Sequence, residues 1–337
     1  MNELYTDAGW VNAQRLIRSP APFVIAVGGR GIGKTYGVLD ELLQIGEPFI
    51  YLRRTQVQID ACKVPELSPF NAVCRDRGIS VSTGTISKYV AGFYRVEGED
   101  QELIALGIAL STFANVRGFD ASGYKYCVFD EFIPERHERP IPHEGDAFLN
   151  VLETINRNRE LLGEDPVKVI MLSNANKLDS PILAAIGALQ PLDKMTRGGR
   201  EWGRWYDGAL EIFRYVDSPI SERKKSGALY RISQSDDFNR MALDNSFGAD
   251  TYYNVCSKPL REYEPVASAQ GITLYRHKSN GTYYVVPGIR SENVYTSSPE
   301  QMRAFCRRCV GSYEALCRGD VYFASAPAKV TFESIWR

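Results

Sequence analysis

The sequence predicts an α/β fold, in which a mainly parallel sheet is covered by helices on both faces and a smaller α+β unit follows. Short apolar runs that end in glycines or acids predict buried strands, and amphipathic helical stretches separate them. Strands that alternate with helices form parallel sheets buried on both faces. The pattern changes after about residue 193, and 337 residues are enough for two domains.

The first domain is expected to open with the strand Phe23–Val27, an apolar run that ends in glycines. Further strands are expected at Pro48–Leu52, Tyr126–Phe129 and Val167–Leu172, with a hairpin and one more strand within Thr85–Thr112. Helices are expected at Tyr36–Ile45 and at Phe148–Leu162, where apolar residues recur at helical spacing.

A glycine-rich break at Thr196–Arg200 and a charged stretch at Ser221–Gly227 indicate a domain boundary between them. We expect residues 1–195 to form the first domain, residues 196–227 a linker with an outer limit near residue 250, and residues 228–337 the second domain. The later elements are predicted at Gly208–Val216 (strand), Ile272–Tyr275 and Thr282–Val286 (hairpin), Glu300–Arg318 (helix) and Val321–Phe323 (strand).

The composition excludes several classes of protein. Hydrophobic residues make up 44% and charged residues 24%, as in an ordinary globular protein and unlike a disordered chain. Seven scattered cysteines do not form a disulfide framework. No apolar run approaches the roughly 20 residues of a membrane helix, and Met1–Leu4 does not begin a signal peptide, so we expect an intracellular protein without a membrane partner. A net charge of −1 is far from that of a static DNA-coating protein.

A phosphate-binding loop of the form GxxxxGK[ST], the Walker A motif, follows the first strand and opens the first helix. Glycines let backbone N–H groups converge on phosphates, and the helix N-terminus adds its partial positive charge. Lys34 is expected to reach the β- and γ-phosphates of the nucleotide, and Thr35 to hold Mg²⁺. The residues expected to bind nucleotide are Gly28, Gly29, Arg30, Gly31, Ile32, Gly33, Lys34 and Thr35.

Two adjacent acids, Asp130 and Glu131, end the strand Tyr126–Phe129 in the manner of a Walker B motif. We expect Asp130 to hold Mg²⁺ and Glu131 to orient and polarise the attacking water, which favours a mechanical ATPase over a small-molecule kinase. Ser173 and Asn174 end a further strand, where they can contact the γ-phosphate or the water.

The segment Asn176–Asp179, just after Ser173 and Asn174, matches NKxD, the motif with which GTPases recognise guanine. This motif favours a GTPase over an ATPase. A GTPase also needs a glycine three residues after the acid that ends the second acidic strand, and none follows Asp130 there. A nucleotide-switch GTPase therefore stays an alternative, as does a scaffold that binds nucleotide without turnover, against which Glu131 argues.

The ordered set of motifs resembles the phi29-like phage DNA-packaging ATPases, which are relatives of the terminase large subunits. The resemblance is carried by Gly28–Thr35, Phe49–Arg54, Val128–Phe132, Arg157–Glu160 and Leu172–Ala175, and more weakly by Ala242–Phe247 and Asn293–Thr296. It implies a RecA-like (ASCE) ATPase domain with an extra strand between the P-loop strand and the acidic strand, then a linker and a small RNase H-like domain.

The resemblance also implies a function and partners. Subunits form a ring, usually a pentamer, on the portal (connector) of an empty capsid in the host cytoplasm. They use ATP and Mg²⁺ to pass double-stranded DNA through a central channel. A packaging RNA, which ties the ring to the portal in phi29, is a further candidate partner.

Several basic residues receive expected roles. Arg157 matches the arginine finger that completes a neighbour's active site, with Arg159 as its substitute, and Arg117 matches a second trans-acting base. Such a finger accelerates hydrolysis about 10³–10⁵-fold in GTPases. Sequence-blind translocation needs phosphate contacts rather than base readout. Candidates for these contacts are Arg53, Arg54, Arg223, Lys224 and Lys225.

The second domain lacks the acids of a two-metal nuclease. Residues 265–337 contain five acids and nine Lys and Arg, and the predicted hairpin strands contain no acid. We therefore expect a nuclease-like fold without nuclease chemistry, with a terminase that has an active nuclease as the alternative. Cys306 and Cys309 form a lone CxxC, which falls short of the four ligands of a structural zinc site.

Overall fold

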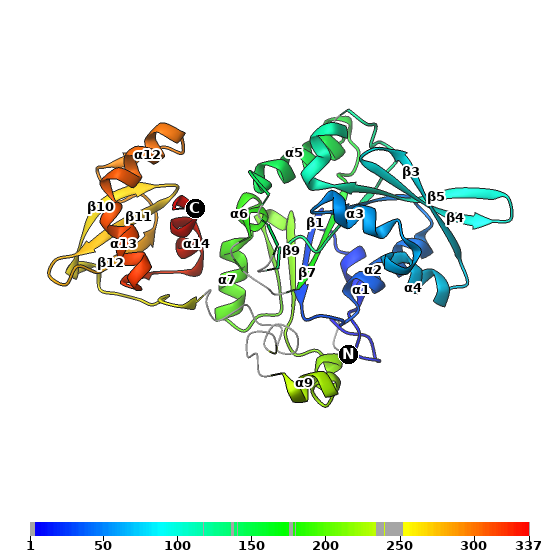
Figure 1. The fold of residues 1–337 in the computed structure, drawn as a ribbon, viewed down its shortest axis with the longest axis horizontal. Coiled ribbons are helices and arrows are strands. Elements are labelled where there is room, and N and C mark those ends of the chain that lie inside the picture. Colours follow the sequence, from blue (N-terminus) through cyan, green and yellow to red (C-terminus); the bar gives the residue numbers. More distant parts are fainter. Residues whose placement is uncertain are drawn as a thin grey trace. The chain divides into compact units, whose positions relative to one another are not determined.

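The computed structural model describes residues 4–116, 118–135, 138–139, 141–174, 178, 180–233, 239 and 252–336. Two compact units make up the chain (Figure 1). The first contains residues 1–191 and 195–247, and the second contains residues 192–194 and 248–337. No helix within the described ranges is long and apolar enough to cross a membrane.

The first unit is built on a nine-stranded sheet of order β3-β4-β5-β2-β6-β7-β1-β9-β8. Neighbours from β5 to β9 pair in parallel, whereas β3, β4 and β8 are antiparallel at the edges. The predicted α/β fold with a mainly parallel sheet is thereby confirmed. The strands are β1 Phe23–Gly28, β2 Phe49–Arg53, β3 Ser80–Ser87, β4 Val90–Glu97, β5 Asp100–Ala109, β6 Tyr126–Asp130, β7 Lys168–Asn174, β8 Trp202–Trp205 and β9 Leu210–Tyr215.

Helices cover both faces of this sheet (Figure 1). Val24 and Val128 pack with helices α1 to α4. The ring of Phe129, the next residue along β6, lies 5.2 Å from that of Phe148 of α5 on the opposite face, tilted by 41°. The alternation follows from the period of two along a strand. The α-helices of this unit are α1 Ala13–Ile17, α2 Lys34–Ile45, α3 Gln56–Cys62, α4 Pro69–Asp76, α5 Glu144–Asn156, α6 Pro181–Ala185, α7 Leu189–Arg197, α8 Pro219–Lys225 and α9 Ala228–Ile232. Short 3₁₀ turns lie at Pro65–Leu67, Leu110–Val116, Glu160–Leu162 and Tyr206–Gly208.

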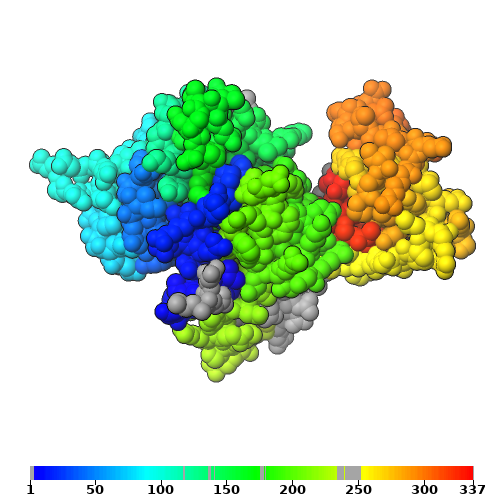
Figure 2. Space-filling view, turned by 180° about the vertical axis from the view of Figure 1, so that it is seen from behind, coloured from blue at the N-terminus to red at the C-terminus, as the bar shows by residue number. Residues whose placement is uncertain are grey.

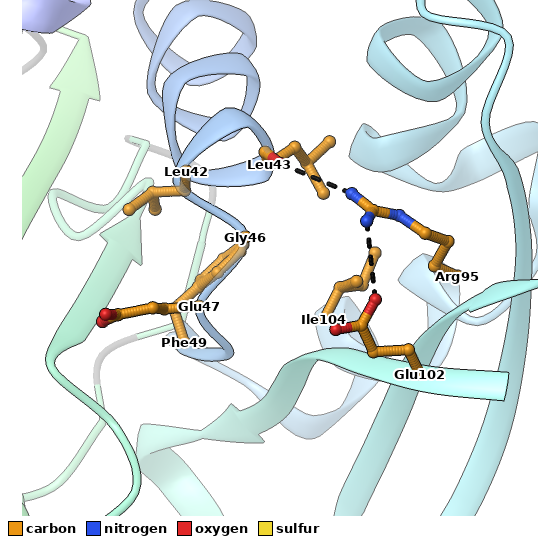
Figure 3. Close-up of a pocket in the computed structure, with 8 residues that line it drawn as sticks. All are labelled: Leu42, Leu43, Gly46, Glu47, Phe49, Arg95, Glu102 and Ile104. Carbon is orange, nitrogen blue, oxygen red and sulfur yellow. Dashed lines mark hydrogen bonds and ion pairs between the residues drawn. The ribbon is translucent and has the colours of Figure 1, made fainter.

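Helix α2 is anchored at the end distant from the phosphate-binding loop (Figure 3). Arg95 of β4 donates a hydrogen bond to the carbonyl oxygen of Leu43 (3.4 Å) and pairs with Glu102 of β5 (3.4 Å). A cation at this position opposes the partial negative charge of the helix C-terminus. Gly46, at φ 76°, ends the helix in the left-handed conformation that glycine adopts most readily. The C-terminal end of the helix that begins with Lys34 is therefore tied to strands β4 and β5.

The chain departs from the predicted elements in two places within this unit. The helix predicted over Phe148–Leu162 ends at Asn156, because Arg157 has a positive φ of 43° and the next residues form a 3₁₀ turn. Residues 196–227, expected as a linker, contain β8, β9 and α8 of the first unit. Strand β9 is the strand predicted at Gly208–Val216, and it pairs in parallel with β1.

The second unit is a five-stranded sheet of order β13-β10-β11-β12-β14 with helices α12 to α14. Its core contains Phe305, Phe323 and Phe332. The predicted helix over residues 300–318 is two helices, because the backbone leaves helical geometry at the buried Cys309. The elements are β10 Tyr263–Ala269, β11 Ile272–His277, β12 Tyr283–Pro287, β13 Val294–Tyr295, β14 Val321–Phe323, α12 Pro299–Arg308, α13 Val310–Arg318 and α14 Ala326–Ile335, with a 3₁₀ turn at Leu260–Glu262.

Candidate active site

Three parallel strands end at one edge of the first unit's sheet, and their last residues are polar or glycine. Strand β7 lies between β1 and β6, so Asn174 is directly opposite Gly28 and Asp130 is opposite Leu172. A cleft of about 370 Å³ opens at this edge. Its lining consists of Arg30, Gly31, Gly33, Lys34, Thr35, Tyr36, Asp130, Glu131, Ser173 and Asn174.

The loop between β1 and α2 needs its glycines for steric reasons. Gly31 and Gly33 have φ values of 63° and 91°, a region that L side chains rarely adopt. A Cβ atom on Gly28 would lie 2.8 Å from the Cβ atom of Tyr215 on β9. Ile32 is fully buried and fastens the loop to the core. The backbone is thus held in a tight arch at the N-terminus of α2, which is a favourable geometry for an anion.

Lys34 is buried at the bottom of this arch. Its Nζ donates hydrogen bonds to the carbonyl oxygens of Gly28 (3.2 Å) and Gly29 (2.6 Å) and to Oδ1 of Asn174 (3.2 Å). Burial lowers the pKa of Lys34 to about 7, opposed by the nearby Asp130. No carboxylate lies within 4 Å of this ammonium among the described residues, so an incoming phosphate would supply the missing negative charge.

Thr35 and Asp130 form the metal-binding side of the cleft. The hydroxyl of Thr35 donates a hydrogen bond to Oδ1 of Asp130 (2.9 Å), and Tyr51 of β2 donates one to Oδ2 (2.8 Å). Hard oxygen ligands of this kind are what Mg²⁺ prefers. Two such oxygens within hydrogen-bonding distance can enter one coordination shell, so the residues present fit a magnesium ion.

Glu131 follows Asp130 in a positive-φ conformation (53°) that turns its side chain into the cleft. The carboxylate is half exposed and forms an ion pair with Arg53 Nη2. Burial raises the pKa of Glu131, and Arg53 opposes the rise. A carboxylate with a raised pKa at the mouth of the cleft is suited to accept a proton from water.

The two arginines at the end of β2 do not offer surface cations to DNA, in contrast to the sequence prediction. Arg53 is 13% exposed, and its guanidinium contacts Asp130 (3.1 Å) and Glu131 inside the cleft. Arg54 is fully buried and pairs with Glu144 of α5 (2.6 Å) and with Glu138 (2.8 Å). Two of the paired carboxylates, those of Asp130 and Glu144, are buried, and the Arg54 guanidinium does not reach the surface.

The two polar residues at the end of β7, Ser173 and Asn174, differ in how free their side chains are to contact a ligand. The hydroxyl of Ser173 accepts a hydrogen bond from the backbone N–H of Ile133 (3.3 Å) and is buried. Asn174 contacts only Lys34 among the hydrogen bonds described for its side chain. Asn174 is therefore the better placed of the two to contact a phosphate or a water.

Two of the predicted trans-acting arginines, Arg157 and Arg159, lie outside the lining of the cleft of their own chain. Arg157 is exposed, and its Nη2 donates one hydrogen bond to the carbonyl oxygen of Phe119 (2.7 Å). Arg159 donates to three carbonyl oxygens of the same loop, those of Ala121, Ser122 and Tyr124. Arg117 lies outside the described residues, as do Asn176, Lys177 and Asp179 of the guanine-type motif.

Two features of the site were missed by sequence reasoning. Lys224 of α8 donates a hydrogen bond to the carbonyl oxygen of Arg30, at the rim of the cleft. A second cleft of about 630 Å³ adjoins the phosphate-binding loop, with Trp10, Asn12 and Tyr36 in its lining. The ring of Trp10 covers Gly33, where a Cβ atom would approach it to 3.2 Å. Aromatic residues close to a P-loop were a usable signal for the second cleft.

The N-terminal segment that carries Trp10 is fixed within the first unit. Tyr5 packs edge-on against Tyr215 of β9 at 5.5 Å, and Gly9 contacts Pro219 at the start of α8. Figure 2 shows this blue segment alongside the green part of the same unit. The wall of the second cleft is therefore held by the same elements that support the phosphate-binding loop.

Comparison with known proteins gives consistent matches. Residues 6–294 match the family described as Podovirus DNA encapsidation protein (Gp16). The DNA packaging proteins of Bacillus phages PZA and phi29 are each 28% identical to this chain, over 72% and 71% of it and over 67% and 66% of their own lengths.

Two solved structures share the fold over nearly the whole chain. A chain of the bacteriophage Phi-29 viral genome packaging motor assembly has a TM-score of 0.67 at 20% identity, and covers 98% of this chain and 99% of its own. A chain of the Phi-28 gp11 DNA packaging motor has a TM-score of 0.62 at 21% identity, and covers 97% and 96%.

Proposed function

Because the chain belongs to the Podovirus DNA encapsidation protein (Gp16) family, we propose that it is an ATPase subunit of a motor that drives double-stranded DNA into a capsid. The family membership agrees with the resemblance of its sequence motifs to phi29-like packaging ATPases. The observation that carries the enzymatic part is the convergence of Lys34, Thr35, Asp130, Glu131 and Asn174 on one cleft.

Each residue of the cleft has a defined task in this proposal. The loop N–H groups and Lys34 bind the phosphates, with the ammonium exchanging its carbonyl contacts for phosphate oxygens. Thr35 and Asp130 would hold Mg²⁺, which when bound neutralises the charge that develops on the phosphates. Glu131 orients the attacking water and accepts its proton. Asn174, beside Lys34, contacts the terminal phosphate or the water.

Stabilisation of the developing charge is assigned to a neighbouring subunit. Arg157 is exposed and makes one hydrogen bond to its own chain, whereas Arg159 makes three. Release of Arg157 from its loop therefore breaks fewer contacts, which supports Arg157 as the arginine finger. Arg117 is retained as a second trans-acting base on the strength of the family resemblance.

The proposal extends to architecture and partners. The order of β6, β7 and β1, with one strand between the P-loop strand and the acidic strand, supports a RecA-like domain. We further propose a pentameric ring on the capsid portal in the host cytoplasm, with a packaging RNA as a candidate partner. Arg223 and Lys225 are exposed and remain candidates for contacts with DNA phosphates.

We propose that the second unit is an RNase H-like fold without nuclease activity. Three of its strands, β10 to β12, form an antiparallel meander, and β13 runs parallel to β10. Glu264 of β10 is the one acid carried by the strands of this described sheet. A two-metal nuclease needs several carboxylates at strand ends, and this count supports a binding role instead.

The first test measures hydrolysis of ATP and GTP by the full chain with and without double-stranded DNA. We expect a preference for ATP and stimulation by DNA. A preference for GTP without a DNA effect would contradict the packaging assignment and favour a nucleotide switch.

Two variants then separate the roles within the site. Glu131→Gln should retain ATP binding and lose hydrolysis, and unchanged turnover would remove Glu131 from the mechanism. Arg157→Ala subunits should regain activity in rings mixed with Glu131→Gln subunits, since one subunit then supplies the intact cleft and its neighbour the intact finger. Absence of rescue at every mixing ratio would count against a trans role for Arg157.

A further inference from the structure

Lys224 belongs to a charged run that the sequence suggests as a contact for DNA phosphates, yet its side chain reaches the phosphate-binding loop. Its Nζ donates a hydrogen bond to the carbonyl oxygen of Arg30, 194 residues away in the chain. The ammonium lies on the open side of Gly31, where a Cβ atom would come within 2.6 Å of it. The neighbouring Arg223 and Lys225 are exposed. Lys224 is therefore distinguished from the rest of the run by its contact with the rim of the cleft.

The helix that presents Lys224 is anchored to the first unit. Helix α8 follows β9 in the chain, its first turn is capped by Ser218, and Ile220 and Ser221 are buried. Pro219 packs on the N-terminal segment at Gly9. An anchored helix limits the positions open to its side chains, so the contact of Lys224 with the loop is set by the packing of α8.

The charges around the loop favour an anion. Within the described structure, Lys34 and Lys224 both point to the loop and have no carboxylate within 4 Å, whereas Arg30 is paired with Glu135. Burial also lowers the pKa of Lys224. A polyphosphate would give both ammonium groups a negatively charged partner at contact distance, which neither has from a carboxylate of the described residues.

We propose that Lys224 is a nucleotide-binding residue that contacts the terminal phosphate from α8. This role for Lys224 rests on the proposed ATPase function. Lys34 approaches the phosphates from the bottom of the arch and Lys224 from the Arg30–Gly31 rim. The ammonium of Lys224 exchanges the Arg30 carbonyl for a phosphate oxygen when ATP binds. ADP lacks that phosphate, so helix α8 contacts the nucleotide in this way only when it is a triphosphate.

The test compares the binding of ATPγS and ADP to the wild-type full chain and to Lys224→Met, by calorimetry in the presence of Mg²⁺ and without DNA. Lys224→Met should weaken ATPγS binding about tenfold or more, as for the loss of a charge-assisted hydrogen bond, and change ADP binding less than about twofold. Lys224→Arg keeps the charge and should recover most of the affinity for ATPγS. Lys125→Met is the matched control, because it removes an exposed lysine of the same unit that pairs with Glu47.

The outcomes separate this inference from the function on which it rests. If the wild-type chain binds neither nucleotide, the ATPase proposal fails. If the wild type binds both and Lys224→Met weakens them equally or not at all, Lys224 is a structural clamp of the loop and the inference is overturned. A separate titration with double-stranded DNA tests the other role of Lys224. If Lys224→Met loses DNA affinity while the ratio of ATPγS to ADP affinity is unchanged, the inference is overturned in favour of a DNA contact.

Discussion

Replacement of Arg54 by methionine tests whether the end of β2 is a buried support of the site or a DNA-binding surface. The guanidinium is fully buried, with Nε 2.6 Å from Glu144 and Nη1 2.8 Å from Glu138. Glu144 is itself buried at the start of α5. Arg54→Met leaves the Glu144 carboxylate buried without its cation.

The size of the effect follows from this geometry. Removing one partner of a buried ion pair costs about 3–5 kcal/mol. For a unit of this size each kcal/mol corresponds to about 2–4 °C in Tm, so we expect the first unit to melt about 6–20 °C lower. The double variant Arg54→Met/Glu144→Leu should recover much of the loss, because replacing both partners of a buried pair by apolar groups is often neutral.

The assay is thermal unfolding followed by calorimetry, together with DNA affinity at fixed salt. Arg75→Met is the control, since the Arg75 side chain is 72% exposed, and its effect should stay within about 0.5 kcal/mol. A loss of stability below about 1 kcal/mol for Arg54→Met, combined with weaker DNA binding, would refute the buried-support role.

Three further predictions concern the cleft. Arg53→Gln removes the cation that lowers the pKa of Glu131, so the acidic limb of the pH–rate profile should move to higher pH; an unmoved limb would contradict this. Gly28→Ala places a Cβ atom 2.8 Å from the nearest side-chain carbon and should destabilise the first unit by about 1–3 kcal/mol in chemical denaturation. The control Gly123→Ala, where a Cβ atom has no neighbour within 4 Å, should leave the stability unchanged. Equal effects of the two variants would argue that position 28 does not need glycine for steric reasons. Thr35→Val should raise the Mg²⁺ concentration for half-maximal hydrolysis about tenfold, because a metal ligand is lost, and an unchanged titration would exclude Thr35 from the metal shell.

The sheet type and the central residues of the site could be predicted from the amino-acid sequence alone. The phosphate-binding loop, the acidic pair and Asn174 are each contiguous with a strand that its own apolar run predicts. Parallel strands end at one edge of a sheet, so residues far apart in sequence meet there without further information. The comparisons confirm the family to which these ordered motifs point.

The positions and contacts of the basic residues, in contrast, could not be predicted without the packed fold. Adjacent residues at the end of a strand point to opposite faces, so Arg53 enters the cleft and Arg54 enters the core beside α5. A positive φ at Arg157 ends α5 earlier than its apolar periodicity predicts. Lys224 meets Arg30 because α8 packs on the N-terminal segment, a contact between distant parts of the chain. Runs of charged residues look alike in sequence. Their roles differ because each role depends on which packed element carries the run, and packing is a property of the whole unit.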